Sequence, residues 1–243
     1  MAKTTPRLYV ETPLSPGAEF ALTQEQGHYL AHVLRQGSGD AVSMFNGLDG
    51  EWLGYITTVT KKSVHVRIET LTLEVKAPPD IDYLFAPLKH ARLDYMVQKA
   101  TELGARRLRP VITQRTIAER VNLDRMRANA IEAAEQCNLV FVPEVMEPLP
   151  LSKVLGAWDE MRQLIYCDET AGVENPVEAL KLIAPPAAVL VGPEGGFTPD
   201  ERAQLKSLAF VTAISLGPRI MRADTVAIAA LSVVQATIGD WKR

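Results

Sequence analysis

The chain has 243 residues and a formal net charge of −3, with 47% apolar and 23% charged residues. These values are typical of a globular protein with one large domain or two small ones. No apolar run is long enough to span a membrane, and residues 1–7 lack the apolar stretch of a secretory signal, so we expect a cytoplasmic protein. Two cysteines and four histidines show no zinc-ligand spacing, so we expect no disulfide framework and no metal site.

Residues 1–73 are predicted to form short strands around a single helix. The helix is expected at residues 24–35, where Tyr29, Leu30, Val33 and Leu34 have the spacing of an apolar stripe. The strands are expected at residues 7–10, 42–45, 51–60 and 63–70. This arrangement favours a small β-barrel, followed by a proline-containing linker at residues 74–80.

From residue 81 to residue 243 the pattern changes to alternating strands and helices. Strands are expected at residues 82–88, 109–113, 162–167, 187–191 and 211–216. Helices are expected at residues 91–103, 123–138, 175–183, 199–208 and 224–239. This alternation predicts an α/β domain whose parallel sheet is covered on both faces.

Charge is distributed unevenly along this second part of the chain. Residues 85–127 contain ten Lys or Arg against four Asp or Glu, whereas residues 128–204 contain four against thirteen. A basic segment in an acidic protein can bind phosphates, and it can equally be a solvated helix surface. The motifs below decide between these interpretations.

A glycine-rich loop follows the apolar strand expected at residues 187–191. Gly192, Gly195 and Gly196 would allow a ligand to approach the backbone, and they permit a positive φ. Thr198 and Glu201 have the spacing of a capping box, so a helix should begin directly after the loop. A loop at the carboxyl end of a parallel strand is a common ligand site, although this one matches neither GxGxxG nor a Walker loop.

A second glycine turn follows the strand expected at residues 211–216. Leu216, Ile220 and Met221 could pack against a planar base, and two arginines flank the last two of these residues. Arg219 and Arg222 precede a helix start, where the helix dipole disfavours a cation. An anionic ligand nearby would resolve that conflict, although both could also be surface arginines.

Several segments together resemble the RsmE family, which methylates N3 of a uridine in 16S ribosomal RNA. The two strongest are VGPEGGF at residues 191–197 and LGPRIMRADTVAIAAL at residues 216–231. Three others occur in the family's order along the chain: HYLAHVLRQGSGD at residues 28–40, MVQKATELG at 96–104 and EAAEQC at 132–137. The resemblance therefore extends over nearly the whole chain.

The resemblance implies a PUA-like RNA-binding barrel over residues 1–73 and a SPOUT methyltransferase domain with a trefoil knot over residues 81–243. It implies a homodimer, to which a face of the last helix could contribute, and S-adenosylmethionine as the cofactor. That helix face consists of Val226, Ala230, Val233, Val234 and Thr237. The implied cofactor-binding residues are Leu190, Gly192, Glu194, Gly195, Gly196, Leu216, Gly217, Ile220, Met221 and Arg222.

Two departures from the family pattern concern individual residues. The family usually has Thr-Glu-Thr where this chain has Ala223, Asp224 and Thr225. The family also has an arginine shortly after the residue that corresponds to Gln136, where this chain has no cation in residues 138–141. The candidate phosphate contacts on ribosomal RNA are Arg7, Arg35, Lys89, Lys99, Arg106, Arg107 and Arg219.

The implied reaction assigns roles to two of the pocket residues. Loss of the N3 proton makes uracil nucleophilic and spreads negative charge onto its carbonyl oxygens, which Arg222 is placed to stabilise. Glu194 is a candidate base, with a structural or cofactor-facing role as the alternative. Three other functions stay open: a non-catalytic ribosome-assembly factor, a SPOUT enzyme with another RNA target, and a nucleotide-dependent oxidoreductase, for which the dinucleotide fingerprint is missing.

Overall fold

The computed structural model describes residues 5–89, 91–118, 120–172 and 175–242. The chain divides into two compact units. The N-terminal unit comprises Met1–Ala77 and Ala134–Val142, and the C-terminal unit comprises Pro78–Ala133 and Pro143–Arg243. The domain boundaries expected from the sequence do not include residues 134–142 in the first unit. Each unit is described below by itself.

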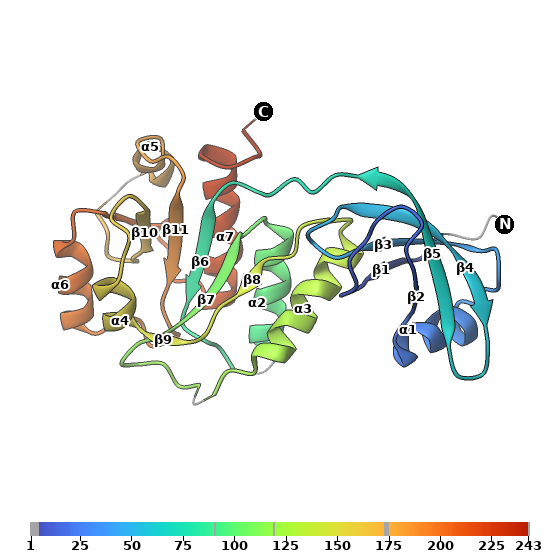
Figure 1. Ribbon diagram of the computed structural model, residues 1–243. Coiled ribbons are helices and arrows are strands. Elements are labelled where there is room, and N and C mark those ends of the chain that lie inside the picture. The colour runs from blue at the N-terminus through green and yellow to red at the C-terminus, as the bar shows by residue number, and fades with distance from the viewer. Residues whose placement is uncertain (1–4, 90, 119, 173–174, 243) are drawn as a thin grey trace. The chain divides into compact units, whose positions relative to one another are not determined.

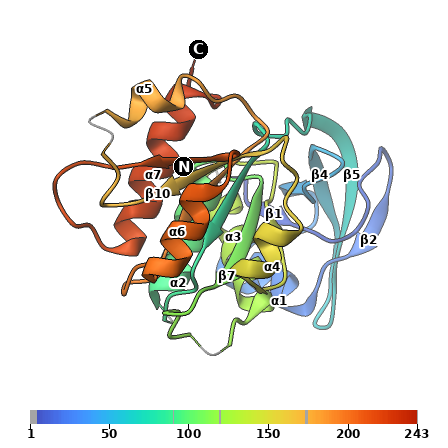
Figure 2. The same cartoon turned by 90° about the vertical axis from the view of Figure 1, so that its left-hand side faces the viewer.

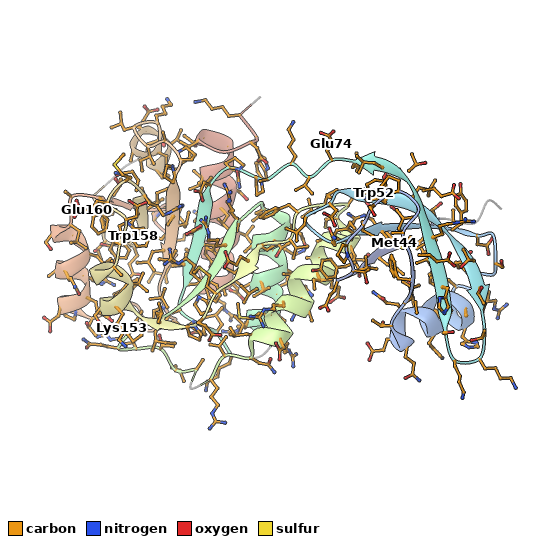
Figure 3. The ribbon with its side chains drawn as sticks, viewed as in Figure 1. Met44, Trp52, Glu74, Lys153, Trp158 and Glu160 are labelled. Carbon is orange, nitrogen blue, oxygen red and sulfur yellow. The ribbon has the colours of Figure 1, made fainter. Side chains whose placement is uncertain are left out.

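The N-terminal unit contains a five-stranded sheet with the strand order β1-β3-β4-β5-β2 (Figure 1). Its strands are β1 (Arg7–Tyr9), β2 (Glu19–Ala21), β3 (Ala41–Phe45), β4 (Glu51–Val59) and β5 (Val64–Leu73). β1 pairs with β3 in parallel, and the other pairs are antiparallel. Met44 of β3 lies opposite Trp52 of β4, and both are buried in the core of this unit (Figure 3). The four predicted strands are confirmed, and β2 is an addition.

The single helix predicted in this unit is present, but its second half is not α-helical. It consists of α1 (Gln24–His28) and a π-helical turn η1 (Tyr29–Val33), in which the Leu34 amide donates to the Tyr29 carbonyl at 2.9 Å. Leu30 is fully buried, whereas 43% of Tyr29 and 59% of Val33 are exposed. The predicted apolar stripe is therefore wrong for these two residues, because the wider π turn changes which side chains face the sheet.

The C-terminal unit is built on a sheet with the strand order β12-β10-β11-β6-β7-β8, and β9 pairs with β7 beside this path (Figure 1). Its strands are β6 (Ile81–Phe85), β7 (Arg107–Ile112), β8 (Glu144–Val145), β9 (Leu149–Pro150), β10 (Gln163–Cys167), β11 (Ala187–Val191) and β12 (Val211–Ile214). Every strand pair is parallel. The central strand β11 is buried along its whole length, as its continuous apolar sequence predicts.

Helices cover both faces of this sheet (Figures 1 and 2). They are α2 (Ala91–Glu102), α3 (Leu123–Gln136), α4 (Leu151–Gly156), α5 (Pro176–Leu180), α6 (Pro199–Ser207) and α7 (Ala223–Thr237). Leu155 of α4 and Leu205 of α6 share one apolar core with Leu164 and Leu190 of the sheet, while α2 and α7 pack together. The predicted α/β class is confirmed, and α4, β8 and β9 are additions.

Candidate functional site

A cavity of about 390 Å³ lies at the carboxyl edge of the C-terminal unit's sheet. Because β11, β10 and β12 run parallel, the segments that follow them meet at one edge. The cavity is lined by Tyr166, Cys167, Asp168, Glu169, Val191, Gly192, Pro193, Glu194, Gly195, Gly196, Phe197, Arg202, Ile220, Met221, Arg222, Ala223 and Val226. Residues of both signature segments therefore line one pocket.

The three glycines of the first loop have different roles. A Cβ on Gly192 would approach the Phe197 ring to 2.5 Å, so this glycine is required by internal packing. Gly196 has a φ of +67°, which L side chains adopt only with strain. A Cβ on Gly195 would meet only the Arg115 side chain, at 3.6 Å, so the backbone here is open towards the cavity. Gly195 is therefore the position where a ligand can approach the main chain.

The loop is held in place by the start of α6. Thr198 and Glu201 form the predicted capping box, in which the Glu201 carboxylate accepts from the Thr198 amide at 2.9 Å. The other carboxylate oxygen of Glu201 accepts from the Gln114 amide at 2.8 Å. Arg115, the next residue, donates to the Gly195 carbonyl at 2.8 Å. The segment after β7 and the glycine loop thus support each other, which preorganises the cavity wall.

Glu194 lines the cavity from the same loop. Its side chain is 38% exposed and lies 3.6 Å from the Arg92 guanidinium of α2. A partly exposed ion pair of this kind contributes little to stability. The carboxylate is therefore accessible from the cavity, and its role as a base stays a prediction.

Arg222 is the N-cap residue of α7 and also lines the cavity. Its side chain makes no cap hydrogen bond, and it has no ion-pair partner among the residues that the structure describes. An arginine at the positive end of a helix dipole is favourable only beside an anion. The unpaired guanidinium is thus available to a negatively charged ligand or transition state.

Seven of the ten predicted cofactor-binding residues line the cavity: Gly192, Glu194, Gly195, Gly196, Ile220, Met221 and Arg222. Leu190 does not line it, because its side chain is fully buried in the apolar core under α4 and α6. Leu216 and Gly217 precede the lining residues of the second segment and are not among them. Their assignment to the cofactor stays a prediction.

The sequence interpretation missed the part of the wall that follows β10. Arg202 of α6 donates to Glu169 at 2.7 Å and to Asp168 at 3.1 Å, and Lys206 lies 2.8 Å from the second Asp168 oxygen. Burial opposes ionisation of Asp168, but hydrogen bonds from Lys206 and Thr170 outweigh it and hold the pKa of this carboxyl below its usual value. The sequence did contain a signal for this part of the wall. The strand expected at residues 162–167 is parallel to its neighbours, so the residues after it had to lie at the same edge of the sheet as the glycine loop.

Two further wall residues come from the end of β10 itself. Burial raises the pKa of the Cys167 thiol to about 12, so this thiol is protonated at neutral pH and is a poor nucleophile. Burial and then the nearby Asp168 raise the pKa of Tyr166, whose hydroxyl has no hydrogen-bond partner among the described residues. Both side chains therefore present neutral polar atoms to this part of the unit.

Two of the predicted RNA contacts are engaged within their own unit. Arg7 is 10% exposed, pairs with Glu51 at 2.9 Å and donates to the carbonyls of Ala134 and Leu139, each at 2.7 Å. Its guanidinium also lies 3.8 Å from the Phe45 ring centroid. Arg107 donates to Asp80 at 2.8 Å and to the buried Asp82 at 2.7 Å. These geometries give both arginines a structural role, and an RNA contact by either one stays a prediction.

The other predicted RNA contacts are more accessible. Lys99 is partly buried and pairs with Glu102 at 2.7 Å, and Arg106 is also partly buried. Arg35, Lys89 and Arg219 are exposed. Lys89 lines a second cavity of the C-terminal unit, of about 730 Å³, together with Arg120 and Arg125 from the basic segment. Asp94 also lines this cavity and pairs with Arg125 at 2.6 Å, so an RNA contact here stays a prediction.

Among the described residues, no three His, Cys, Asp or Glu side chains are grouped so that they could hold a metal ion. Within the same part of the chain, no helix has both the length and the apolar character needed to cross a membrane.

Comparisons with known proteins agree with this geometry. A family model described as an RNA methyltransferase domain matches residues 75–235, and one described as an RNA methyltransferase PUA domain matches residues 22–69, which confirms the PUA-like prediction. Ribosomal RNA small subunit methyltransferase E of Rickettsia conorii is 30% identical over 94% of each chain. The same-named protein of Bacillus subtilis is 29% identical over 88% of this chain and 89% of that one.

Two solved structures carry a bound ligand. A putative methyltransferase from Legionella pneumophila, in complex with S-adenosylmethionine, is 31% identical and has a TM-score of 0.83, with 98% of this chain and 99% of that chain covered. A ribosomal RNA small subunit methyltransferase E from Neisseria gonorrhoeae, bound to S-adenosyl methionine, is 27% identical and has a TM-score of 0.82, with 98% and 100% covered.

Proposed function

The chain belongs to the RNA methyltransferase family that includes ribosomal RNA small subunit methyltransferase E, and on this premise we propose that it transfers a methyl group from S-adenosylmethionine to N3 of a uridine in 16S ribosomal RNA. The observation that carries the proposal is the cavity itself. Its wall combines the open backbone at Gly195 with the guanidinium of Arg222, for which the described part of the chain offers no ion-pair partner.

The cavity suits S-adenosylmethionine in size and in chemistry. Its volume of about 390 Å³ lies within the range of roughly 300–1,000 Å³ found for small-molecule sites. Val191, Met221 and Val226 offer apolar surface to an adenine ring, and the glycine loop offers main-chain groups to its edge. When bound, the cofactor would supply a methyl group that its sulfonium charge makes electrophilic.

The residues of this chain would then act on the uracil. N3 carries a proton and is a poor nucleophile until that proton leaves. A carboxylate such as Glu194, or a water molecule, would accept the proton. Arg222 would stabilise the negative charge that spreads to the carbonyl oxygens, because its guanidinium carries the opposite charge and can donate hydrogen bonds to them. Since pairing hides N3, the target uridine would be unpaired or flipped out.

The proposal includes the trefoil knot, a homodimer and a cytoplasmic location. Ala230 and Val234, two residues of the α7 face expected at the interface, are fully buried within the protomer and cannot form it. Leu182 and Ile220 of the same unit are better candidates, because these residues are 90% and 89% exposed.

A cytoplasmic location agrees with the two free cysteines, which persist in a reducing compartment.

Methyl transfer in vitro tests this function. Purified protein is incubated with methyl-labelled S-adenosylmethionine and 16S RNA, either free or in the assembled small subunit, and the labelled nucleoside is identified by mass spectrometry. We expect 3-methyluridine in at least one of the two substrates. Transfer RNA is tested in parallel, and label in transfer RNA alone, or none in either ribosomal substrate, would contradict the proposal.

A further inference from the structure

A small basic pocket in the N-terminal unit lies between the helical segment α1–η1 and the turn that joins β4 to β5. Its volume is about 90 Å³. It is lined by Thr23, Gln24, Gly27, His28, Ala31, His32, Thr60, Lys61, Lys62, Ser63 and Val64. None of these residues belongs to the methyl-transfer site, and their clustering needs its own explanation.

Gly27 allows the helix to lie close to the start of β5. A Cβ at this position would approach the Val64 side chain to 3.3 Å, and the Leu22 amide already donates to the Val64 carbonyl at 2.9 Å. A larger residue would therefore push the helix away from the strand. The close approach brings one face of the helix against residues 60–63.

Two histidines occupy that face. His28 and His32 are one helical turn apart, and their ring centroids are 4.9 Å from each other. Both side chains are exposed. The π-helical turn η1 begins immediately after His28, and π-helical turns occur frequently at functional sites.

The opposite wall is a rigid turn with two consecutive lysines. The Thr60 amide donates to the Ser63 carbonyl at 2.9 Å, and the Thr60 hydroxyl accepts from the amides of Ser63 at 2.9 Å and Lys62 at 3.2 Å. These bonds hold Lys61 and Lys62 at the tip of the turn. The Thr60 hydroxyl also donates to the Ser63 carbonyl at 3.1 Å, which closes the turn.

The charges of this pocket are not compensated by the unit itself. No carboxylate lines the cavity, and His28, His32, Lys61 and Lys62 have no ion-pair partner among the residues that the structure describes. The ammonium groups of the two consecutive lysines repel each other, so an anion between them would be stabilising. The small volume of about 90 Å³ suits a compact anionic group such as a phosphate.

We propose that this pocket binds a backbone phosphate of the RNA substrate. Two observations favour RNA over free phosphate. The pocket lies within residues 22–69, the segment that matches the RNA methyltransferase PUA domain. The same helical segment also exposes 43% of Tyr29, an aromatic surface on which an adjacent unpaired base could stack. The assignment of RNA as the ligand rests on the proposed function.

Substitution of the lysines provides the first test. Lys61→Gln/Lys62→Gln removes two charges at exposed positions and should leave the fold intact. We expect the affinity for a single-stranded fragment of 16S RNA to fall by on the order of tenfold at low salt, with a salt-dependence slope smaller by about 1. Lys153→Gln, an exposed lysine on α4 (Figure 3), is the matched control and should change neither quantity. Equal behaviour of both variants would overturn the assignment.

A second variant and a second ligand complete the test. His28→Gln/His32→Gln should weaken RNA binding as the lysine variant does, and both should raise KM for RNA with the single-turnover rate at saturation unchanged. Inorganic phosphate is titrated while the histidine ring signals are followed by NMR. Saturation by phosphate without any effect of the variants on RNA binding would indicate a free-phosphate site and refute the RNA assignment. Wild-type protein that binds RNA through this pocket but methylates none would refute the proposed function alone.

Discussion

At the scale of single residues, the three glycines of the loop have three different structural roles. The sequence predicts that Gly192, Gly195 and Gly196 bring a ligand to the backbone, and all three line the cavity. However, Gly192 makes room for Phe197, and Gly196 has the positive φ. These requirements depend on tertiary packing and on backbone angles, which residue spacing does not reveal.

Alanine substitutions should distinguish a glycine that the backbone conformation requires from one that leaves room for the cofactor. Gly196→Ala places a side chain at a φ of +67° and should lower the free energy of unfolding by about 1–2 kcal/mol. Gly195→Ala should leave stability nearly unchanged and weaken S-adenosylmethionine binding, because its Cβ enters the space that the ligand approaches. Urea denaturation and calorimetric titration measure the two effects. Unchanged cofactor affinity in Gly195→Ala would show that this glycine is only a turn residue.

Arg222 is the residue on which the proposed mechanism depends most. Arg222→Ala should lower kcat and kcat/KM together by on the order of 10² to 10³ and spare cofactor affinity, as expected for loss of one preorganised donor. Arg222→Lys should restore activity only in part, because an ammonium lacks the planar fork of a guanidinium. Arg219→Ala, an exposed arginine of the same segment, is the control and should affect only RNA binding.

Single-turnover methylation, combined with separate titrations of RNA and of S-adenosylmethionine, distinguishes a catalytic role of Arg222 from a role in binding either ligand. Weaker RNA binding with an unchanged rate at saturation would make it a phosphate contact. Loss of cofactor affinity alone would assign it to the cofactor's carboxylate.

At the scale of elements, long periodic segments could be predicted from sequence and short ones could not. β11 is predicted with its observed bounds because a continuous apolar run has few alternatives. β2, β8, β9 and α4 have at most six residues each, so their patterns carry too little signal. The π turn was also missed, since an apolar stripe at helical spacing does not distinguish it from a continuing α-helix.

The end of α3 gives a prediction at this scale. Arg7 lies against the last turn of the helix and donates to the carbonyl of Ala134, and to that of Leu139 just beyond the helix. Because the side chain is buried and pairs with Glu51, Arg7→Ala should destabilise the N-terminal unit by about 2–4 kcal/mol. Arg127→Ala, an exposed arginine of the same helix, should cost less than about 0.5 kcal/mol.

Urea unfolding followed through Trp52 fluorescence reports on the N-terminal unit, since Trp158 and Trp241 belong to the other unit. Variants without Trp158 and Trp241 isolate this signal. A midpoint for Arg7→Ala equal to that of Arg127→Ala would mean that Arg7 is free to contact RNA.

At the scale of the whole molecule, the sequence predicted the change from strands around one helix to alternating strands and helices. It did not predict that residues 134–142 belong to the N-terminal unit. Their place in that unit depends on contacts between residues far apart in the sequence, such as the hydrogen bond from Arg7 to the Leu139 carbonyl. The site was predictable where it coincides with the two signature segments. The wall that follows β10 was not, since Asp168 and Glu169 form no recognisable motif by themselves.

The proposed homodimer is a prediction about the whole molecule. Light scattering at micromolar concentration should give about twice the chain mass of 26.7 kDa. Ile220→Asp should shift the mass towards that of one chain, because a charge would enter the apolar interface, whereas Met161→Asp changes another exposed apolar residue and serves as the control. A wild-type mass of one chain would refute the dimer.

The most direct test of the central claim is nucleoside mass spectrometry of 16S ribosomal RNA from a strain that lacks this protein. We predict that one 3-methyluridine is absent from the deletion strain, returns when the wild-type chain is supplied, and does not return to normal levels with Arg222→Ala. Unchanged 3-methyluridine in the deletion strain, with no other enzyme making the same modification, would contradict the account.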